Sequence, residues 1–343
     1  MFNVPRLAAC LGLTLATLAP SVWAAPAPVA PKVMLIAMFA PEAQHWIERL
    51  KLTQEFKVAG LSAEYPTVRC NAQQVCLMVT GMGQTNAAAS TLALGLSTEF
   101  DLRKTYFVVA GIAGINPHHG TLGTAAWARY LVEFGTQWEL DARDAPKHWP
   151  TGYTGINTKG PDEKPPLDYK TEVFELNPAL QAKALALSQN VLLSESRESA
   201  AWRQHYPYAP ANQAPVVTQC DTLAGNTWFS GTRLSERAEV WTRLLTDNKG
   251  VYCTTQQEDN STYEALLRAS RAGKVDIARL AVVRAGADFD RPYPGYSEAD
   301  NLLKYAEQGG FVPALENLYR AGNPLVQDIV EHWAQWESGV PGV

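Results

Sequence analysis

The amino-acid sequence predicts an α/β domain with a central mixed, mostly parallel sheet. Apolar runs of strand length recur along the chain, segments with helical periodicity alternate with them, and glycines or acids follow several of the runs. The chain has 343 residues and is 46% hydrophobic, which suffices for a large core. We therefore expect residues 32–343 to form a single domain.

The N-terminal 24 residues have the features of a cleavable secretory signal. A basic residue precedes an apolar run over residues 7–19, and Val22 and Ala24 suit a cut before Ala25. The run is too short to span a bilayer comfortably. Prolines then predict a stiff leader over residues 25–31. We expect a mature protein that is periplasmic or secreted, without stable membrane insertion.

The cysteines that remain after removal of the signal are even in number, which is compatible with disulfides in an oxidising compartment. Cys70 and Cys76 flank a segment typical of a hairpin connection, so we expect a bridge between them. Cys220 and Cys253, each near a strand end, would form the second pair. Four buried free thiols are the alternative.

Charge and composition argue against two classes of partner. The formal net charge is −5 and no long run of like charge occurs, so nothing indicates binding to nucleic acid. His118 and His119 are adjacent, so their side chains diverge, and no cysteine or carboxylate lies at ligand spacing beside them. We expect neither a metal nor another cofactor.

The first strand and helix come at residues 32–39 and from Pro41 onward. Proline at the first helical position and Glu42 in the first turn are typical of a helix start. Glu42 is therefore either an acid favoured by the helix dipole or, because it follows the first strand, part of a ligand site.

Two further strands, residues 75–79 and 105–110, lead into glycines. Gly81 and Gly83 precede an alanine-rich helix, and Gly111 follows the second strand. Such glycines let backbone N–H groups approach a ligand and aim a helix N-terminus at it. Tight-turn packing explains them equally well.

The middle of the chain contains a long loop and a candidate aromatic contact. Residues 144–166 lack periodicity, which predicts a surface loop of the kind used as a lid. A helix is expected over residues 177–190 and a short strand over residues 216–219. Trp228, further on, either packs in the core or stacks on a ligand.

Residues 251–255 form another expected strand. Glu258 lies in the short connection after it, where a ligand carboxylate belongs, and a surface glutamate is the alternative. Asn260 follows, and Ser261 to Glu264 has the pattern of a capping box that opens a helix to residue 272.

The strongest site candidate is residues 282–292, which begin as an apolar strand and turn abruptly into glycine and acid. Ligands of α/β proteins bind beyond the carboxyl ends of the strands, so Asp288 is a candidate ligand-facing acid. A solvated strand end is the alternative. Asp290 competes with Asp288, but Phe289 and the residues after it indicate that the strand ends there. Three helices are expected afterwards, starting at Ser297, Phe311 and Asn323.

Taken in order, six segments make the chain resemble the purine nucleoside permease family and, through it, the fold of nucleoside phosphorylases and methylthioadenosine-type nucleosidases. The segments are AMFAPEA (37–43), VTGMGQTNAAAS (79–90), VVAGIAGINP (108–117), CDTLAGNTWF (220–229), QEDNST (257–262) and VVRAGADFDRP (282–292). The resemblance covers nearly all of the chain from residue 32 onward. It implies a three-layer sandwich with helices on both sides of the sheet.

The resemblance also implies roles for individual residues. In the nucleosidase-like fold, an acid at the end of the last core strand protonates the departing purine at N7, and Asp288 matches it. The glutamate on the ribose hydroxyls matches Glu258, and the glutamate that orients the attacking water corresponds best to Glu42. Asn260, Trp228 and the glycines of the two junctions complete the predicted nucleoside site.

Two positions depart from the phosphorylases of this fold. Val109 stands where they have an arginine for phosphate, and Ile112 stands where they tend to have a hydroxyl. Because an apolar pair cannot stabilise a phosphate dianion, phosphorolysis is the weakest hypothesis. Ala287 likewise replaces a hydroxyl residue common in relatives, which bears on how Asp288 is supported.

The sequence therefore predicts an exported protein that handles purine nucleosides. Hydrolysis of the N-glycosidic bond is the leading hypothesis, because both Glu258 and Asp288 are present and binding alone needs no buried acid. A non-catalytic component of nucleoside uptake is the alternative. Whether the protein is a monomer or a homo-oligomer stays open.

Overall fold

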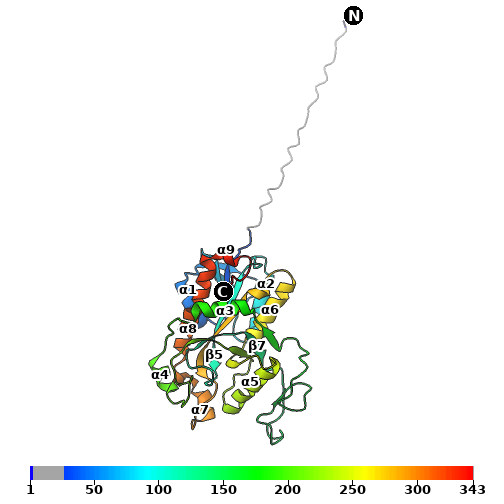
Figure 1. Cartoon of the computed structure of the whole chain (residues 1–343). Helices are drawn as coiled ribbons and strands as arrows, with labels where there is room; N and C mark the ends of the chain where they lie inside the picture. The colour runs from blue at the N-terminus through cyan, green and yellow to red at the C-terminus, as the bar shows by residue number, and fades with distance from the viewer. Residues whose placement is uncertain (3–26, 343) are drawn as a thin grey trace.

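A 12-stranded mixed sheet lies at the centre of the protein (Figure 1). The computed structural model describes residues 1–2 and 27–342. The predicted signal beyond its first two residues, its cleavage site and the start of the leader lie outside the described residues. Val29 of the leader pairs with Phe100 as an isolated parallel bridge, so the leader packs along the domain.

Strands and helices alternate in parts of the chain, but not throughout as expected, because residues 106–175 form six strands with no helix between them. The strands of the main sheet are β1 Val33–Ala37, β2 Gln54–Lys57, β3 Thr67–Cys70, β4 Val75–Val79, β5 Tyr106–Ile115, β6 Ala125–Trp127, β7 Tyr130–Glu133, β10 Val173–Glu175, β11 Val217–Gln219, β12 Asp221–Ala224, β13 Tyr252–Gln256 and β14 Leu280–Phe289. A separate pair is formed by β8 Trp138–Glu139 and β9 Tyr153–Thr154. The helices are α1 Ala40–Arg49, α2 Gln84–Leu96, α3 Pro178–Ser188, α4 Arg197–Arg203, α5 Thr232–Leu245, α6 Asp259–Arg271, α7 Glu298–Leu303, α8 Phe311–Glu331 and α9 Trp333–Trp336, with 3₁₀ turns η1 Ile277–Arg279 and η2 Tyr305–Gln308.

The main path of the sheet runs in the order β10-β7-β12-β13-β5-β1-β4-β3-β2, and β14 pairs with β5 and β6 beside this path. The long strand β5 connects these parts, because it pairs in parallel with β1 and β14 and antiparallel with β13. The carboxyl ends of β1 and β14, which run parallel to β5, and of β13, which runs antiparallel to it, lie along the second half of β5, and β12 ends beside β13. A site shared by several strand ends is therefore built into the topology.

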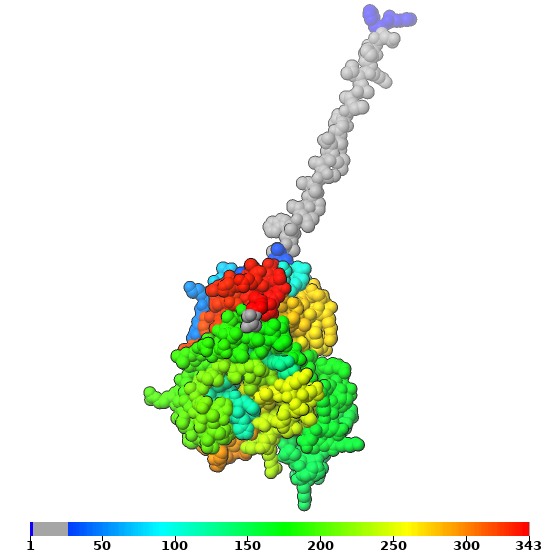
Figure 2. All heavy atoms as spheres, in the orientation of Figure 1, coloured from blue at the N-terminus to red at the C-terminus, as the bar shows by residue number. Residues whose placement is uncertain are grey.

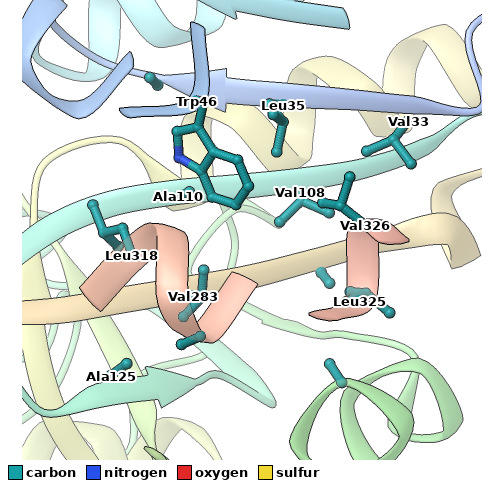
Figure 3. Close-up of a cluster of buried hydrophobic side chains, with 14 of the residues drawn as sticks. Val33, Leu35, Trp46, Val108, Ala110, Ala125, Val283, Leu318, Leu325 and Val326 are labelled. Atoms are coloured by element: carbon teal, nitrogen blue, oxygen red, sulfur yellow. The ribbon is translucent and has the colours of Figure 1, made fainter. Parts of the chain in front are cut away.

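Helices cover both faces of the sheet, which confirms the predicted three-layer sandwich. Val33 and Leu35 of β1 face a core formed with Trp46 of α1 and with helices α3 and α8, whereas Met34 and Ile36 face a second core with α2 and α6. This alternation is the period of two of a strand buried on both sides. Figure 3 shows α8 packed on β1, β5 and β14 in the first core. In Figure 2 the C-terminal helices, in red, lie beside the start of the domain, where Lys32 Nζ donates to the Val330 carbonyl at 3.3 Å.

One predicted strand end was wrong. β5 does not stop at Ala110 but continues through Gly111 and Gly114 to Ile115, whereas β14 ends at Phe289, where the sequence indicated. The two strands pair along this whole length, with a register shift between Gly286 and Asp288. The hydrogen bonds of the ladder therefore outweigh the weak strand preference of glycine.

Two helix boundaries also differ from the prediction. Helix α6 begins at Asp259, before the predicted capping box, with Glu258 at its N-cap and no side-chain cap. A separate helix from Asn323 was wrong, because α8 is one helix with Pro324 inside it. Its buried stripe packs on the sheet over the whole length, which offsets the roughly 3 kcal/mol cost of an internal proline.

Both predicted disulfides are present. Cys70 and Cys76 lie opposite each other in the β3–β4 hairpin with their Cα atoms 4.0 Å apart. Cys220 and Cys253, with Cα atoms 5.6 Å apart, join the start of β12 to β13. The second bridge thus ties together two strands whose carboxyl ends reach the cavity described below. Across the described residues, no helix is long and apolar enough to span a membrane.

Candidate functional site

A cavity of about 560 Å³ opens beside the second half of β5, at the carboxyl ends of β1, β12, β13 and β14. Its wall combines four charged side chains with an apolar, partly aromatic surface. The lining residues are Met38, Phe39, Glu42, Met82, Ile112, Ala113, Gly114, Gly225, Thr227, Trp228, Thr255, Gln256, Gln257, Glu258, Arg284, Ala287, Asp288, Tyr305, Ala306 and Phe311. The size suits a small organic ligand.

Glu42 is buried at the start of α1, and backbone groups hold its carboxyl. The Met38 N–H donates to one oxygen at 2.8 Å and the Ile112 N–H donates to the other at 2.8 Å. Burial raises the pKa of Glu42 to about 8, although the nearby Arg284 charge acts in the opposite direction. This glutamate is therefore an acid–base group near neutral pH rather than a permanently charged one.

Arg284 is the charged centre of the cavity and was not singled out from the sequence. Its guanidinium contacts both oxygens of Asp259 at 3.2 and 2.5 Å and one oxygen of Glu258 at 3.2 Å. It also donates to the Ile112 carbonyl at 3.1 Å. The sequence feature that could have identified Arg284 is a single arginine within an apolar strand, because a buried charge requires partners.

Glu258 lies at the N-cap of α6, as the strand–helix connection suggested. One of its oxygens accepts from the Gly83 N–H at 2.9 Å, and the other contacts Arg284. Each carboxylate oxygen has further acceptor capacity toward the cavity. The positive φ of Gly83, +88°, explains why glycine is needed at this turn.

Asp288, the second-last residue of β14, lines the cavity. Burial, with a smaller effect of the Asp290 charge, raises its pKa to about 7. Within the described part of the chain, no hydrogen bond reaches its carboxyl group. One oxygen lies beside Gly114, where an added Cβ would be 3.3 Å away. Asp288 is thus a buried acid with a free proton position facing the ligand space.

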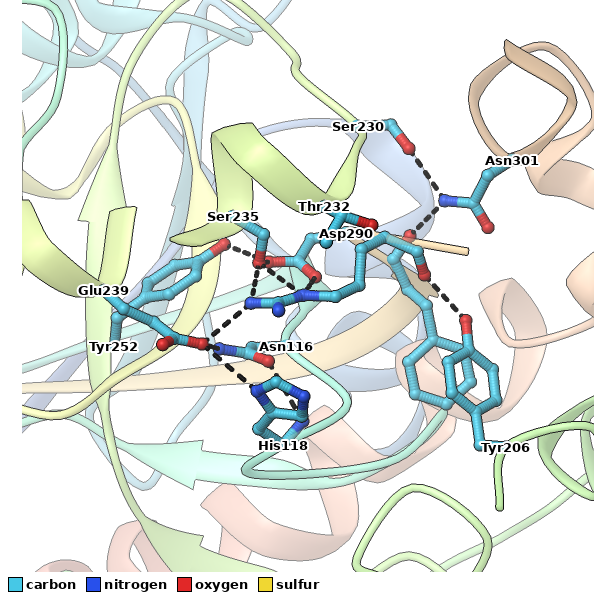
Figure 4. A network of polar contacts seen from close by, with 12 residues as sticks. Asn116, His118, Tyr206, Ser230, Thr232, Ser235, Glu239, Tyr252, Asp290 and Asn301 are labelled. Atoms are coloured by element: carbon cyan, nitrogen blue, oxygen red, sulfur yellow. Dashed lines mark hydrogen bonds and ion pairs between the residues drawn. The ribbon is translucent and has the colours of Figure 1, made fainter. Parts of the chain in front are cut away.

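Asp290, the competing acid, belongs to a different environment (Figure 4). Its carboxylate accepts from the Tyr252 hydroxyl at 2.6 Å and from the Ser235 hydroxyl, and it lies 3.6 Å from Arg291. None of these residues lines the cavity. The strand ends at Phe289, as predicted, so Asp290 turns into this buried network instead of the cavity.

Aromatic side chains form one wall of the cavity. Trp228 is 48% exposed and its ring lies 4.7 Å from that of Tyr305, and Phe39 lies 6.3 Å from Phe311. The neighbouring Phe229 is buried in the core. Of Trp228 and Phe229, only Trp228 is placed for ligand contact.

Gly111 does not contact the ligand space but makes room for its charged groups. A Cβ at this position would lie 1.9 Å from Met38 Cε, 2.4 Å from Arg284 Nη1 and 3.0 Å from Glu42 Oε1. Gly81, with φ of +83°, shapes the turn that presents Met82 to the cavity. The predicted glycines, Gly81, Gly83 and Gly111, therefore support the site instead of lining it.

We expect Gly111→Ala to lower the free energy of unfolding by about 1–3 kcal/mol, the usual cost of overpacking. Arg284 cannot move away easily because Asp259 holds it. Gly225→Ala is the matched control, since this lining glycine has its nearest contact at 3.5 Å and should tolerate the methyl group. Urea unfolding of the two variants measures the difference, and equal stabilities would contradict the close approach.

Two predicted features lie away from the cavity. Asn260 donates to the Leu131 and Thr171 carbonyls and lines a second, smaller hollow of about 420 Å³ between α2 and α6. No residue of the loop 144–166 lines the cavity, so it is not a lid over this site in the structure. Over residues 27–342, no group of three His, Cys, Asp or Glu side chains is placed to hold a metal ion.

Solved structures with the same architecture define the fold class. A 5′-methylthioadenosine/S-adenosylhomocysteine nucleosidase from Helicobacter pylori has a TM-score of 0.52 and 14% identity, with 88% of this chain and 99% of that chain covered. The futalosine hydrolase of Helicobacter pylori has a TM-score of 0.51 and 13% identity, with 88% and 98% covered. At these identities the similarity concerns the fold alone. The protein thus has the nucleoside phosphorylase-like fold that the sequence predicted.

Sequence comparison narrows the class to a family. The family model for purine nucleoside permease (NUP) matches residues 30–341. A probable purine nucleoside permease of Schizosaccharomyces pombe is 39% identical over 322 residues, covering 89% of this chain and 91% of the relative. A purine nucleoside permease of Candida albicans is 37% identical over 315 residues, covering 90% and 77%. The chain belongs to the purine nucleoside permease family.

Proposed function

We propose that this protein binds purine nucleosides in the cavity and hydrolyses their N-glycosidic bond. The observation that carries the proposal is that two buried acids, Asp288 and Glu42, line one cavity together with the Glu258–Arg284 ion pair. The names of the relatives support purine nucleosides as ligands, and the structural neighbours named above are hydrolytic enzymes.

The two acids lie at different points of one strand. Glu42 lies beside Gly111 and Asp288 lies beside Gly114, which are about 10 Å apart along β5. A nucleoside in the cavity would have the attacking water at Glu42 and its base at Asp288. The Trp228–Tyr305 wall would stack on the base, and Glu258 would accept hydrogen bonds from the sugar hydroxyls.

The reaction then divides among three carboxyl groups. As the bond between C1′ and the base nitrogen breaks, Asp288 transfers its proton to the purine, which leaves as a neutral base. The negative charge of Glu258 favours the cationic character that develops on the sugar. Ionised Glu42 takes a proton from the water that attacks C1′, so the products are free purine and free sugar.

The structure changes the argument about phosphate. The expected anion site is not wholly apolar, because Arg284 lines the cavity, whereas Val109 is buried in the core. However, Arg284 is already paired with Asp259 and Glu258. An arginine between two carboxylates offers little net charge to a phosphate dianion, which supports hydrolysis over phosphorolysis.

We expect free purine to appear from inosine or adenosine in phosphate-free buffer, at a rate that millimolar phosphate leaves nearly unchanged. The sugar product should be unphosphorylated. Chromatography of both products with and without phosphate makes the measurement. Ribose 1-phosphate, or a strict need for phosphate, would contradict the hydrolytic assignment.

The second candidate is a binding component of nucleoside uptake, which the permease names of the relatives favour. In that case the same assay would show nucleoside bound but no base released. For either function we propose export, with residues 1–24 removed. The intact mass of the exported protein tests this, and a retained N-terminus would exclude cleavage.

A further inference from the structure

One side of the cavity is formed by a strap, defined as residues 297–310, which comprises α7, η2 and their flanking residues. The strap contributes Tyr305 and Ala306 to the cavity wall, and Tyr305 packs against Trp228. It is therefore the segment that would contact the base in the proposed function.

Two buried amide side chains of the strap hold the strand that carries Asp288. Gln308 Oε1 accepts from the Phe289 N–H at 2.7 Å, and Asn301 Nδ2 donates to the Phe289 carbonyl at 2.9 Å. The two amides are joined by a 3.2 Å hydrogen bond from Gln308 Nε2 to Asn301 Oδ1. Both side chains are fully buried, at 0% and 1% exposure. Together they form hydrogen bonds with the two peptide groups on either side of Phe289.

These hydrogen bonds occur where β14 loses its regular pairing with the neighbouring strands. On one edge β6 pairs with β14 only over Val283–Ala285, and on the other edge the register with β5 shifts between Gly286 and Asp288. The amide pair takes over the backbone groups of Phe289 just beyond this point. Without it, the peptide groups next to Asp288 would be buried without partners at a bulge.

The end of the strap also abuts the residue before Asp288. A Cβ at Gly310 would lie 2.4 Å from the Ala287 carbonyl oxygen, so the two backbones touch at this point. Asn301 makes one more contact, to the Ser230 hydroxyl at 2.7 Å, in the segment after Trp228 (Figure 4). The strap, the Trp228 segment and the end of β14 are therefore fixed to one another.

We propose that Gln308 and Asn301 are positioning residues that set the Asp288 carboxyl against the base-contacting wall of the cavity. The proposal rests on the proposed function, because it assigns the amide pair to the placement of the general acid. A displacement of about 1 Å at a reacting group can cost on the order of 10²-fold in rate. The hydrogen bonds to Phe289 restrict such a displacement directly.

A double-mutant cycle separates this role from a contribution to folding alone. We expect Gln308→Met, which keeps the size but loses the acceptor, to lower kcat for base release from inosine by about 10- to 100-fold. In the Asp288→Asn background the same change should cost less than about twofold, because its effect acts through Asp288. Asn317→Leu is the matched control, since it removes another buried amide, which bonds Gly123 and Ser194 outside the cavity lining, and it should retain nearly full activity.

An equal loss in both backgrounds would overturn the proposal and leave Gln308 as a purely structural residue. A loss for Asn317→Leu as large as for Gln308→Met would overturn it as well. If Gln308→Met does not fold, Asn301→Ala takes its place in the cycle.

If the wild-type protein releases no base, the proposed function has failed by itself. The same double-mutant cycle then tests the amide pair, with the Kd for a purine C-nucleoside as the measured quantity. The carbon–carbon bond between base and sugar in this ligand resists hydrolysis. Weaker binding only when Asp288 is present would support positioning. Equal weakening in both backgrounds would contradict it.

Discussion

Asp288→Asn should abolish most base release while leaving nucleoside binding in place. Asparagine keeps the size of the side chain but cannot deliver a proton, so we expect kcat to fall by about 10²-fold or more. Kinetics with inosine and equilibrium binding of the same nucleoside check the two parts. A variant that retains more than about a tenth of the rate would exclude Asp288 as the general acid.

The same substitution should stabilise the protein at high pH. The pKa of Asp288 is raised from the ordinary 3.8 to about 7, so its contribution to folding is fully present below pH 4 and is lost as the pH rises through 7. At pH 8 the ionised buried carboxylate costs up to about 4 kcal/mol, which asparagine avoids. The difference in Tm between variant and wild type should therefore grow from pH 5 to pH 8.

Asp290→Asn is the matched control for this prediction. It lies two residues away and is equally buried, but its carboxylate is held by Tyr252 and Ser235 outside the cavity. We expect a milder loss of rate than for Asp288→Asn. A loss as large as that of Asp288→Asn would mean that the assignment of the acid is wrong.

Glu258→Gln should weaken binding and catalysis together. The substitution removes the charged acceptor for the sugar hydroxyls and leaves Arg284 with Asp259 as its remaining acidic partner. Hydrogen bonds to a charged group contribute about 1.5–3 kcal/mol, so kcat/KM should fall by about 10- to 10²-fold, with KM clearly raised.

Glu264→Gln is the control on the same helix, since Glu264 pairs with Arg268 and lines the second hollow instead of the cavity. Steady-state kinetics of both variants make the comparison. An unchanged KM for Glu258→Gln would place the sugar elsewhere.

The layers of the fold could be predicted because each core strand is strongly apolar and each helix has a start signal. β1 and α1 are examples, with Pro41 and Glu42 at the helix start. The short edge strand β2 was missed, since its exposed polar residues carry no apolar pattern. The end of β5 was misplaced at Gly111, because the pairing between β5 and β14 is a tertiary effect that local preferences do not contain.

The candidate site could be predicted in part from the order of strands and the residues that follow them. Asp288, Glu258 and Glu42 follow strands at the carboxyl edge of the sheet, so their convergence follows from topology alone. Arg284 and the Gln308–Asn301 pair were missed, because they act through contacts between segments far apart in the chain. Asn260 was placed in the site by its closeness in sequence to Glu258, but the first turn of α6 directs it to the other hollow.

The pH dependence of base release tests the central claim most directly, namely that two buried acids in one cavity perform hydrolysis. Glu42, with a pKa of about 8, must be ionised, and Asp288, with a pKa of about 7, must be protonated. We therefore expect kcat/KM for inosine to peak between pH 7 and 8 and to fall by about tenfold per pH unit on either side. A flat profile from pH 5 to 9, or nucleoside binding without base release at any pH, would contradict the account.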